Sequence, residues 1–207
     1  MTAHEGDLNG SIRNVSDLGP GARPVEGDRI SQARRDPAAF ADLCQRHYDR
    51  VFRYCVHRLF ARDTAEDVTS TVFLKVVGGF DGFRGGEQDF VRWLWRIATN
   101  TVNAHLRKTA RRERLLGTLA SEVRTENTGI PVADEAAETR LALKRAILGL
   151  KPRHQAIIAL RFFEDMSVSE IAALTGGSPS TVRSQLSRAL ARLRRDMARS
   201  GVGREFG

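Results

Sequence analysis

Residues 167–194, SVSEIAALTGGSPSTVRSQLSRALARLR, contain two apolar-periodic segments separated by a pair of glycines. Ser167 and Glu170 have the spacing of a capping box, which predicts the start of a short helix. The glycine pair at 176–177 predicts a tight turn, and the Ser-Pro pair at 178–179 predicts the N-cap and the first position of a second helix. Two short helices joined in this way predict a helix-turn-helix.

The second helix of this pair is amphipathic. Its apolar stripe consists of Val182, Leu186, Ala189, Leu190 and Leu193. Its opposite face carries hydroxyl and arginine side chains, the types that reach phosphates and base edges when a helix enters a major groove. These candidate DNA-binding residues are Ser180, Thr181, Arg183, Ser184, Ser187, Arg188 and Arg192. A helical hairpin with a solvated charged face is the alternative, but caps, glycine turn and basic helix together favour DNA binding.

The composition of the whole chain points the same way. Its 207 residues include 33 Lys and Arg against 25 Asp and Glu, a net charge of +8, which favours a polyanionic partner such as nucleic acid. The sequence has neither a secretory signal pattern nor an apolar run of about 18 residues, so we expect a cytoplasmic protein without membrane contact. Cys44 and Cys55 are about three helical turns apart, too far for a disulfide, which predicts buried reduced thiols.

Hydrophobic periodicity divides the chain into two helical units, a linker and two tails. The polar, glycine-containing start predicts a flexible tail without a fold, and a stretch that turns from basic to acidic predicts a flexible linker. The expected boundaries are residues 1–35 for the N-terminal tail, 36–110 for the first unit, 111–137 for the linker, 138–199 for the second unit and 200–207 for the C-terminal tail. The sequence thus predicts an all-α protein of two small helical domains joined by a flexible linker.

The first unit is expected to hold three helices. The first runs from Asp36 to about Phe60, the second opens with a capping sequence at 63–66 and ends at the glycine pair 78–79, and the third starts near Asp89. Aromatic and basic residues are interleaved in the loop before the third helix and along it. They are Phe80, Phe83, Phe90, Trp93 and Trp95 with Arg84, Arg92, Arg96, Arg107 and Lys108. This mixture suits the stacking of unpaired bases beside a neutralised strand, although each ring taken alone could equally pack in the core.

The order of these motifs resembles the extracytoplasmic-function (ECF) group of the bacterial sigma-70 family. The resembling segments are FADLCQRHYDRVFRYC, DTAEDVTSTVFLKVV, FRGGEQDFVRWLWRIATNTVNAHLRK and LGLKPRHQAIIALRFFEDMSVSEIA with the helix-turn-helix that follows. They lie within residues 36–108 and 138–197. The resemblance implies a transcription-initiation factor in which a region 2 domain is tethered to a region 4 domain, without the third domain of housekeeping sigma factors between them.

The same resemblance implies partners and roles for individual residues. The second helix would dock on the clamp helices of the largest subunit of core RNA polymerase, through Asp67, Thr71, Phe73, Leu74 and Lys75. The loop and third helix would melt and hold the −10 element of promoter DNA, through Phe83, Arg84, Trp93, Arg96, Asn100, Asn103, Arg107 and Lys108. The recognition helix of region 4 would read the duplex −35 element, and an anti-sigma factor would be a further partner.

The sequence lacks the residue combinations that a catalytic site requires. The histidines show no pairing of a nucleophile with a base, and no glycine loop is built to cradle a phosphate, so we expect neither an enzyme nor a cofactor. Cys44 and His47 have a spacing compatible with metal binding, but two ligands do not make a structural zinc site, so no metal is expected.

Two other non-enzymatic readings are possible. The first is a stand-alone helix-turn-helix regulator that binds a duplex operator as a dimer. The aromatic and basic third helix argues against it, because a protein that binds only duplex DNA does not need to hold single strands. The second is an interaction protein such as an anti-sigma scaffold, which leaves the basic recognition helix unexplained.

Overall fold

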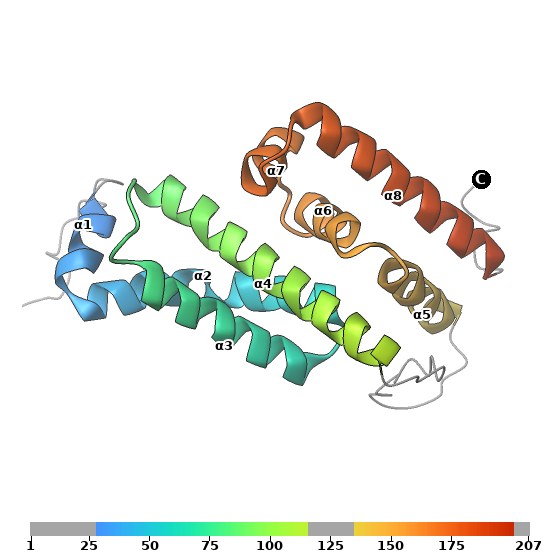
Figure 1. The fold of residues 1–207 in the computed structure, drawn as a ribbon, viewed down its shortest axis with the longest axis horizontal. Coiled ribbons are helices and arrows are strands. Elements are labelled where there is room, and N and C mark those ends of the chain that lie inside the picture. Colours follow the sequence, from blue (N-terminus) through green and yellow to red (C-terminus); the bar gives the residue numbers. More distant parts are fainter. Residues whose placement is uncertain (1–27, 116–134, 201–207) are drawn as a thin grey trace, which may run out of the picture.

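The computed structural model describes residues 28–115 and 135–200, and every regular element within them is a helix (Figure 1). The helices are α1 (Asp28–Arg35), α2 (Pro37–Leu59), α3 (Arg62–Gly79), α4 (Glu87–Leu115), α5 (Glu135–Leu148), α6 (Pro152–Phe162), α7 (Val168–Thr175) and α8 (Pro179–Arg199). The all-α prediction is confirmed. The predicted tails and linker lie largely outside the described residues, at 1–27, 116–134 and 201–207.

The first unit consists of α1 to α4, with α2, α3 and α4 packed around an apolar core (Figure 1). Its fully buried side chains include Val51, Tyr54, Val72, Phe90, Trp95 and Val102. They recur at helical spacing, so each helix turns one apolar stripe inward. The start of α2 is also as expected, because the Asp36 carboxylate accepts a hydrogen bond from the backbone N–H of Ala38 (2.9 Å).

Two helix ends in this unit differ from the sequence prediction. Helix α3 begins at Arg62 with Ala61 as its N-cap and no side-chain capping bond, so the residues at 63–66 form its first turn instead of capping it. Helix α4 begins at Glu87 and continues to Leu115, beyond the predicted boundary at residue 110. Basic residues beyond that boundary therefore extend the helix and do not start a linker.

The prediction of a flexible tail is wrong for residues 28–35, which form α1. Ile30 and Ala33 of this helix are buried, and α1 packs on α2. Two buried side chains in eight residues are too few to reveal a helical period in the sequence. An isolated helix of this length is also not stable in water. Helix α1 exists because the rest of the unit covers its apolar side.

The second unit consists of α5 to α8, and its caps are those predicted. The Ser167 hydroxyl accepts from the backbone N–H of Glu170 (3.2 Å), and the Glu170 carboxylate accepts from the N–H of Ser167 (2.7 Å). Gly176 ends α7 with a left-handed φ of 71°, a conformation in which glycine is favoured. The Ser178 hydroxyl then accepts from the N–H of Thr181 (3.2 Å) to start α8. The helix-turn-helix prediction is confirmed.

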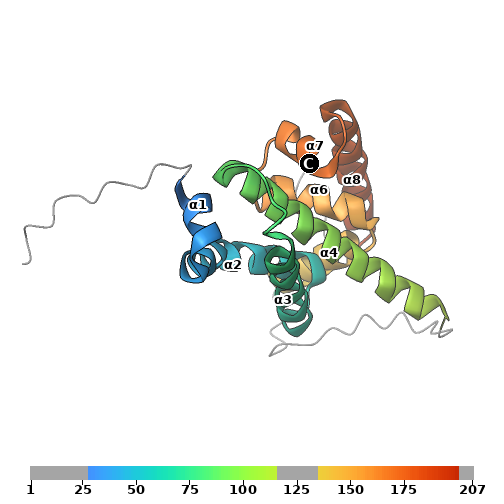
Figure 2. The same cartoon turned by 60° about the vertical axis from the view of Figure 1, so that its left-hand side comes forward.

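The two units lie against each other, with α6 and α7 packed on α2 and α4 (Figures 1 and 2). One cluster of buried apolar side chains includes Val51 and Leu94 from the first unit and Leu160 and Ile171 from the second. Phe60, at the end of α2, packs against the separate cluster of the second unit. Two domains that the sequence predicts as tethered neighbours thus share a core.

Candidate nucleic-acid interface

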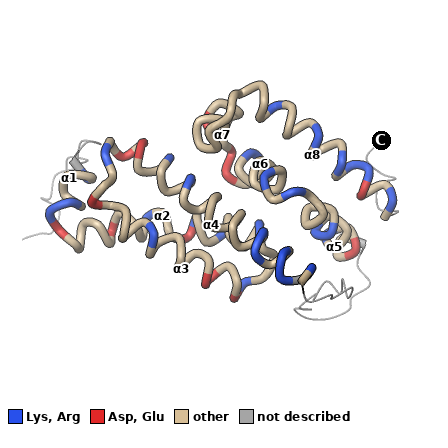
Figure 3. The backbone as a smooth tube through the Cα atoms, viewed as in Figure 1, with Lys and Arg blue, Asp and Glu red and all other residues tan. Residues whose placement is uncertain are grey.

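Helix α8 has the two faces that its sequence predicts. Val182, Ala189 and Leu193 are buried against the second unit. All seven candidate DNA-binding side chains are exposed: Ser180, Thr181, Arg183, Ser184, Ser187, Arg188 and Arg192. Basic residues recur along the whole helix (Figure 3). The exposed face therefore combines hydroxyl groups near the N-terminus with guanidinium groups toward the C-terminus.

The N-terminus of α8 is held by hydroxyl groups. The Ser178 hydroxyl is hydrogen-bonded to the hydroxyls of Ser180 (2.8 Å) and Thr181 (2.9 Å) as well as to the Thr181 N–H. The first backbone N–H groups of a helix and its dipole make such an end attractive to phosphate. The same end of the helix follows the glycine turn, so it is fixed relative to α7.

The aromatic residues near the start of α4 form a core cluster. The Phe83 ring centroid lies 5.2 Å from that of Trp93 and 5.9 Å from that of Phe90, and Phe83 is 7% exposed. Phe80 and Trp95 are also buried. The ring of Phe83, one of the two aromatic −10 candidates, is therefore covered in this arrangement, and Phe80, Phe90 and Trp95 have the core positions that the sequence left possible. Hydrophobic packing wins because each ring can bury its whole apolar surface here.

The polar −10 candidates are divided by their surroundings. Arg96, Asn100, Arg107 and Lys108 are exposed on α4. Asn103 is half-buried, and its side-chain oxygen accepts a hydrogen bond from Arg58 (2.7 Å). The more C-terminal of the exposed residues continue into a strongly basic helix end (Figure 3).

Arg84 lies in the loop between α3 and α4 (residues 80–86) and is exposed. Its guanidinium turns back on the loop and donates to the backbone oxygens of Asp81 (2.7 Å) and Phe83 (2.8 Å). Trp93 is partly buried and packs on the end of α3, where a Cβ added to Gly79 would come within 2.9 Å of its ring. Of the aromatic candidates, Trp93 alone keeps a partly exposed ring among the described residues.

The outer face of α3 carries the polymerase candidates. Leu74 is 71% exposed, and Val77, one turn further, is 57% exposed. Asp67, Thr71 and Lys75 are exposed on the same helix. Phe73 differs, because its ring is half-buried and stacks on Tyr48 at 5.4 Å. These two exposed apolar side chains within a charged surface make the outer face of α3 a candidate interaction surface.

The part of the chain that the structure describes contains neither a membrane-spanning helix nor a cluster of metal ligands. Within 28–115 and 135–200, no helix is long and apolar enough to span a bilayer. In the same ranges no group of three or more His, Cys, Asp or Glu side chains is placed to hold a metal ion. Cys44 and Cys55 are both free thiols, and burial raises the pKa of Cys44 to about 11, which keeps it protonated at neutral pH.

Known proteins share both units. A family model described as sigma-70 region 2 matches residues 43–112, and one described as sigma-70, region 4 matches residues 140–193. The ECF RNA polymerase sigma factor BldN of Streptomyces coelicolor is 34% identical over 166 residues, 78% of this chain. The RNA polymerase sigma factor CarQ of Myxococcus xanthus is 31% identical over 160 residues, 75% of this chain. The chain belongs to the ECF group of the sigma-70 family.

The extent of the likeness to these relatives varies. The chain spans 62% of the length of BldN and 87% of that of CarQ. Among solved structures, the sigma factor RpoE in complex with the anti-sigma factor NepR from Bartonella quintana has a TM-score of 0.56 and 21% sequence identity, over 77% of this chain and 96% of that chain. At this identity the likeness concerns the fold, which is that of helical regions 2 and 4.

In this sigma factor, regions 2 and 4 are joined by an ion pair. Arg50 Nε on α2 lies 2.6 Å from the Glu164 carboxylate after α6, and the same guanidinium donates to the Glu164 backbone oxygen (3.2 Å). The Glu164 side chain is 5% exposed. Burial raises the pKa of Glu164, while the bonds and charge of Arg50 lower it. Burial has the larger effect, so the pKa of Glu164 stays above its ordinary value, and the desolvation cost offsets part of the attraction between the two charges.

Arg58 makes a second tie between the regions. It is 1% exposed and donates to the Tyr54 hydroxyl (2.6 Å), to Asn103 (2.7 Å) and to the backbone oxygen of Pro152 at the start of α6 (3.0 Å). Arg58 is not among the residues predicted from the sequence, although the helical period indicates that it is buried. Residue 58 falls four positions after Tyr54 and seven after Val51, which is the buried stripe of α2.

The regions also meet through two side chains that stack. The His57 ring of α2 lies on the Phe163 ring with centroids 4.0 Å apart and planes 5° apart. Arg50, Arg53, His57, Phe163, Glu164 and Asp165 line a pocket at this junction. Region 4 also approaches the −10 candidate Arg96 on α4, since a Cβ added to Gly176 would come within 4.0 Å of its guanidinium. The junction therefore brings the recognition-helix turn close to residues assigned to the −10 element.

Proposed function

We propose that this sigma factor binds core RNA polymerase, reads the −35 element with α8, and helps to open and hold the −10 element with the 80–86 loop and α4. The observation that carries the proposal is the exposed face of α8, where hydroxyl and arginine side chains follow a capped N-terminus and a glycine turn. The proposal gives the chain a binding role in the cytoplasm and no catalytic step.

The −35 contact uses duplex DNA. A helix that enters the major groove with its N-terminal end first brings Ser180 and Arg183 toward base edges, and more C-terminal arginines toward phosphates. Arg192, Arg195 and Arg199 line a shallow pocket with Asp196 at the far end of α8. This end supplies affinity without sequence information, because phosphate contacts are the same for every base pair.

The −10 contact uses a single strand. Extruding a base costs a few kcal/mol, which contacts to the flipped base must offset. Because the Phe83 ring is buried, we assign these contacts to Arg84, Arg96, Asn100 and the partly exposed Trp93. Arginine planes stack on unpaired bases as aromatic rings do, so a basic helix can replace the buried ring in this role. Arg107 and Lys108 would neutralise the strand backbone.

The polymerase contact uses the exposed face of α3. Leu74 and Val77 supply apolar area, and Asp67, Thr71 and Lys75 surround it with polar groups. An apolar centre with a polar rim is the usual anatomy of a protein interface. Phe73 contributes from below the surface, by its packing on Tyr48.

The packed arrangement of regions 2 and 4 must open for this function. Elements centred at −10 and −35 are about 25 base pairs apart, which is about 85 Å along B-DNA at 3.4 Å per step. Helices α4 and α7 are in contact in the structure. Residues 116–134, which join the regions, could span at most about 65 Å when fully extended. This length, added to the width of the two regions, is enough for region 2 to reach the −10 element while region 4 is bound at −35.

An anti-sigma factor is part of the proposal. The related fold of RpoE was solved in complex with the anti-sigma factor NepR. We propose that this chain has a partner of the same class, which would compete with core polymerase for the free sigma factor.

Reconstituted run-off transcription on genomic fragments tests the proposal. Purified chain with core polymerase should start transcription at discrete promoters, because each partner supplies what the other lacks. The chain alone should bind those promoters weakly. Tight binding to an operator without polymerase, together with no initiation, would contradict the proposal and support a stand-alone helix-turn-helix regulator.

A further inference from the structure

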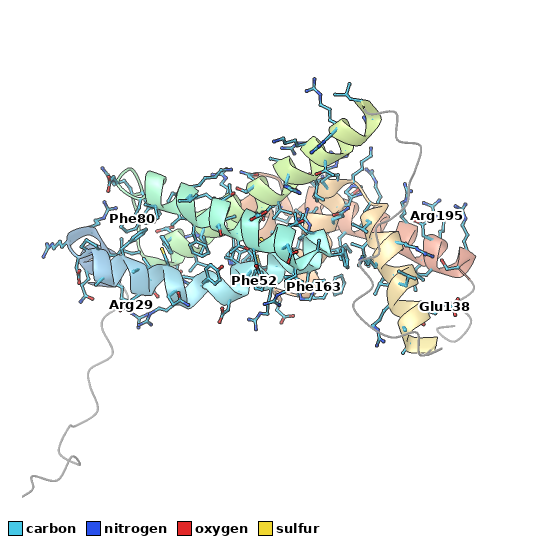
Figure 4. All side chains as sticks on the ribbon, turned by 90° about the horizontal axis from the view of Figure 1, so that it is seen from below. Arg29, Phe52, Phe80, Glu138, Phe163 and Arg195 are labelled. Atoms are coloured by element: carbon cyan, nitrogen blue, oxygen red, sulfur yellow. The ribbon has the colours of Figure 1, made fainter. Side chains whose placement is uncertain are left out.

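Helix α1 contacts the 80–86 loop and lies outside both matched family segments, the first of which begins at residue 43. Figure 1 shows α1 beside the connection from α3 to α4, and Figure 4 places Arg29 and Phe80 at the same end of the molecule. Two arginines of α1 reach this connection, one in its middle and one at its end.

Arg34 holds the middle of the loop. Its guanidinium donates to the backbone oxygen of Phe83 and lies 5.7 Å from the centroid of the Phe80 ring. The same backbone oxygen accepts from Arg84 (2.8 Å). A carbonyl oxygen has two lone pairs, so Arg34 and Arg84 together fill this acceptor. The position of the Arg84 guanidinium, a −10 candidate, is thus coupled to that of Arg34.

Arg29 holds the end of the loop. Its Nη1 lies 2.9 Å from one carboxylate oxygen of Glu87, the first residue of α4. The other Glu87 oxygen is buried without a hydrogen-bond partner within the described ranges. His47 is the second basic group near this carboxylate; burial lowers its pKa, and Glu87 acts in the opposite direction. Loss of Arg29 would leave a largely buried carboxylate with a weakly basic neighbour.

The loop itself is anchored on its inner side only. Phe80 and Phe83 are buried, whereas Asp81, Gly82 and Arg84 are exposed. Gly85 has a φ of 133°, and a Cβ there would lie 2.6 Å from the Asp89 side chain. The chain therefore turns sharply into α4 directly after Arg84, whose guanidinium is held by two backbone oxygens of the loop, one of which it shares with Arg34.

We propose that Arg29 and Arg34 are positioning residues for −10 recognition. Helix α1 clasps the loop at its middle and at its end, so that Arg84 and the first turn of α4 present one fixed shape to an unpaired base. The inference rests on the proposed function. A loop that is ordered before binding loses less entropy when the base arrives, and it discriminates better between bases of different shape.

The experiment uses the full chain with core polymerase on a promoter found by run-off transcription. Templates carry a −10 region that is already unpaired, with each position varied in turn, so that base preference is measured apart from melting. The variants are Arg34→Ala, Arg34→Lys, Arg29→Glu, and Arg29→Glu combined with Glu87→Arg. Arg35→Ala is the matched control, since it removes an exposed charge from the next position of α1.

Arg34→Ala should lower the preference for the favoured −10 bases about tenfold, the effect of losing one hydrogen bond to a charged group. Arg34→Lys should retain part of the preference. Arg29→Glu should lower it similarly, and addition of Glu87→Arg should restore it. Binding to the −35 duplex and the Arg35→Ala control should match wild type.

A base profile in Arg34→Ala and Arg29→Glu that equals the wild-type profile overturns the clasp. Equal loss on every −10 sequence without rescue by Glu87→Arg also overturns it, because α1 would then only stabilise the fold. If the wild-type chain does not initiate with core polymerase, the proposed function itself fails. If the wild type initiates and the variants keep its −10 base preference, only the proposed role of Arg29 and Arg34 fails.

Discussion

Arg58 shows how a single residue can belong to two regions. Its guanidinium faces three neutral acceptors, from Tyr54, Asn103 and Pro152, and its Nε has no hydrogen-bond partner within the described residues. A buried cation is costly unless hydrogen bonds compensate for lost water. The three bonds do so only while α2, α4 and α6 stay together. Burial raises the pKa of the Tyr54 hydroxyl, and the Arg58 charge opposes this rise.

Arg58→Ala should therefore lower the free energy of unfolding by about 3 kcal/mol or more, since it removes several charged hydrogen bonds and leaves a cavity. Urea denaturation followed by circular dichroism measures the change. Arg92→Ala is the control, because its pair with Asp89 (2.6 Å) is exposed and within one helix. The control should change stability by less than about 0.5 kcal/mol. Equal effects of the two substitutions would contradict the structural role given to Arg58.

At the scale of the element, α8 shows that a helix end can serve both folding and binding. Ser178 accepts the N–H of Thr181 and so satisfies one of the first free backbone donors. It is exposed at the end of the helix that we direct into the major groove, between the two phosphate backbones. The cap requires an oxygen acceptor, whereas DNA binding requires the absence of a negative charge. Substitutions at this one position can separate the two.

Ser178→Asn should keep both stability and −35 binding, because asparagine caps a helix as well as serine does. Ser178→Asp should keep stability but weaken −35 binding, since a carboxylate repels phosphate. Ser178→Ala should lower stability by about 1 kcal/mol. Thermal unfolding and binding to a −35 duplex in the polymerase complex measure the two effects. Unchanged DNA binding in Ser178→Asp would place this end of α8 away from the phosphates.

At the scale of the whole molecule, the structure shows a closed sigma factor. Trp95 is buried in the first unit, and Arg50 lies over its ring at 5.2 Å while pairing with Glu164 of the second unit. Phe60 ends α2 with a left-handed φ of 54°, and Asp165 follows Glu164 with a φ of 52°. Both are non-glycine residues in a region favourable to glycine, so strain is stored on both sides of the junction. In the proposed function, this junction is the part of the molecule that opens.

Arg50→Glu should shift the free protein toward an open form, because it places two carboxylates together at a buried position. Small-angle X-ray scattering should then report a larger radius of gyration. Combination with Glu164→Arg should restore most of the compact form, although the contact with Trp95 is lost. Arg92→Glu, which breaks an exposed pair within α4, is the control. A radius unchanged in Arg50→Glu would show that the apolar core alone holds the regions together.

Some features of this fold depend on residues that are close together in the sequence, and others depend on residues that are far apart in it. The sequence alone determined the caps at Ser167 and Ser178, the turn at Gly176 and the two faces of α8, because these depend on residues within about four positions of each other. It also determined the family, since each short helical motif is a local pattern and the order of the motifs can be seen along the chain. The same reasoning placed the exposed polymerase candidates Leu74 and Lys75 on one helix.

Only the tertiary structure decided which side chains remain available for binding. The Phe83 ring reads as a stacking group in the sequence but is covered by Phe90 and Trp93. Helix α1 is too short to show a period in the sequence, and the apolar side chains that stabilise it belong to other segments. Arg50 and Glu164 are 114 residues apart, and nothing near either one predicts their pairing. Such contacts form only when whole units dock. Their contribution to the free energy of folding therefore cannot be seen in any short stretch of the sequence.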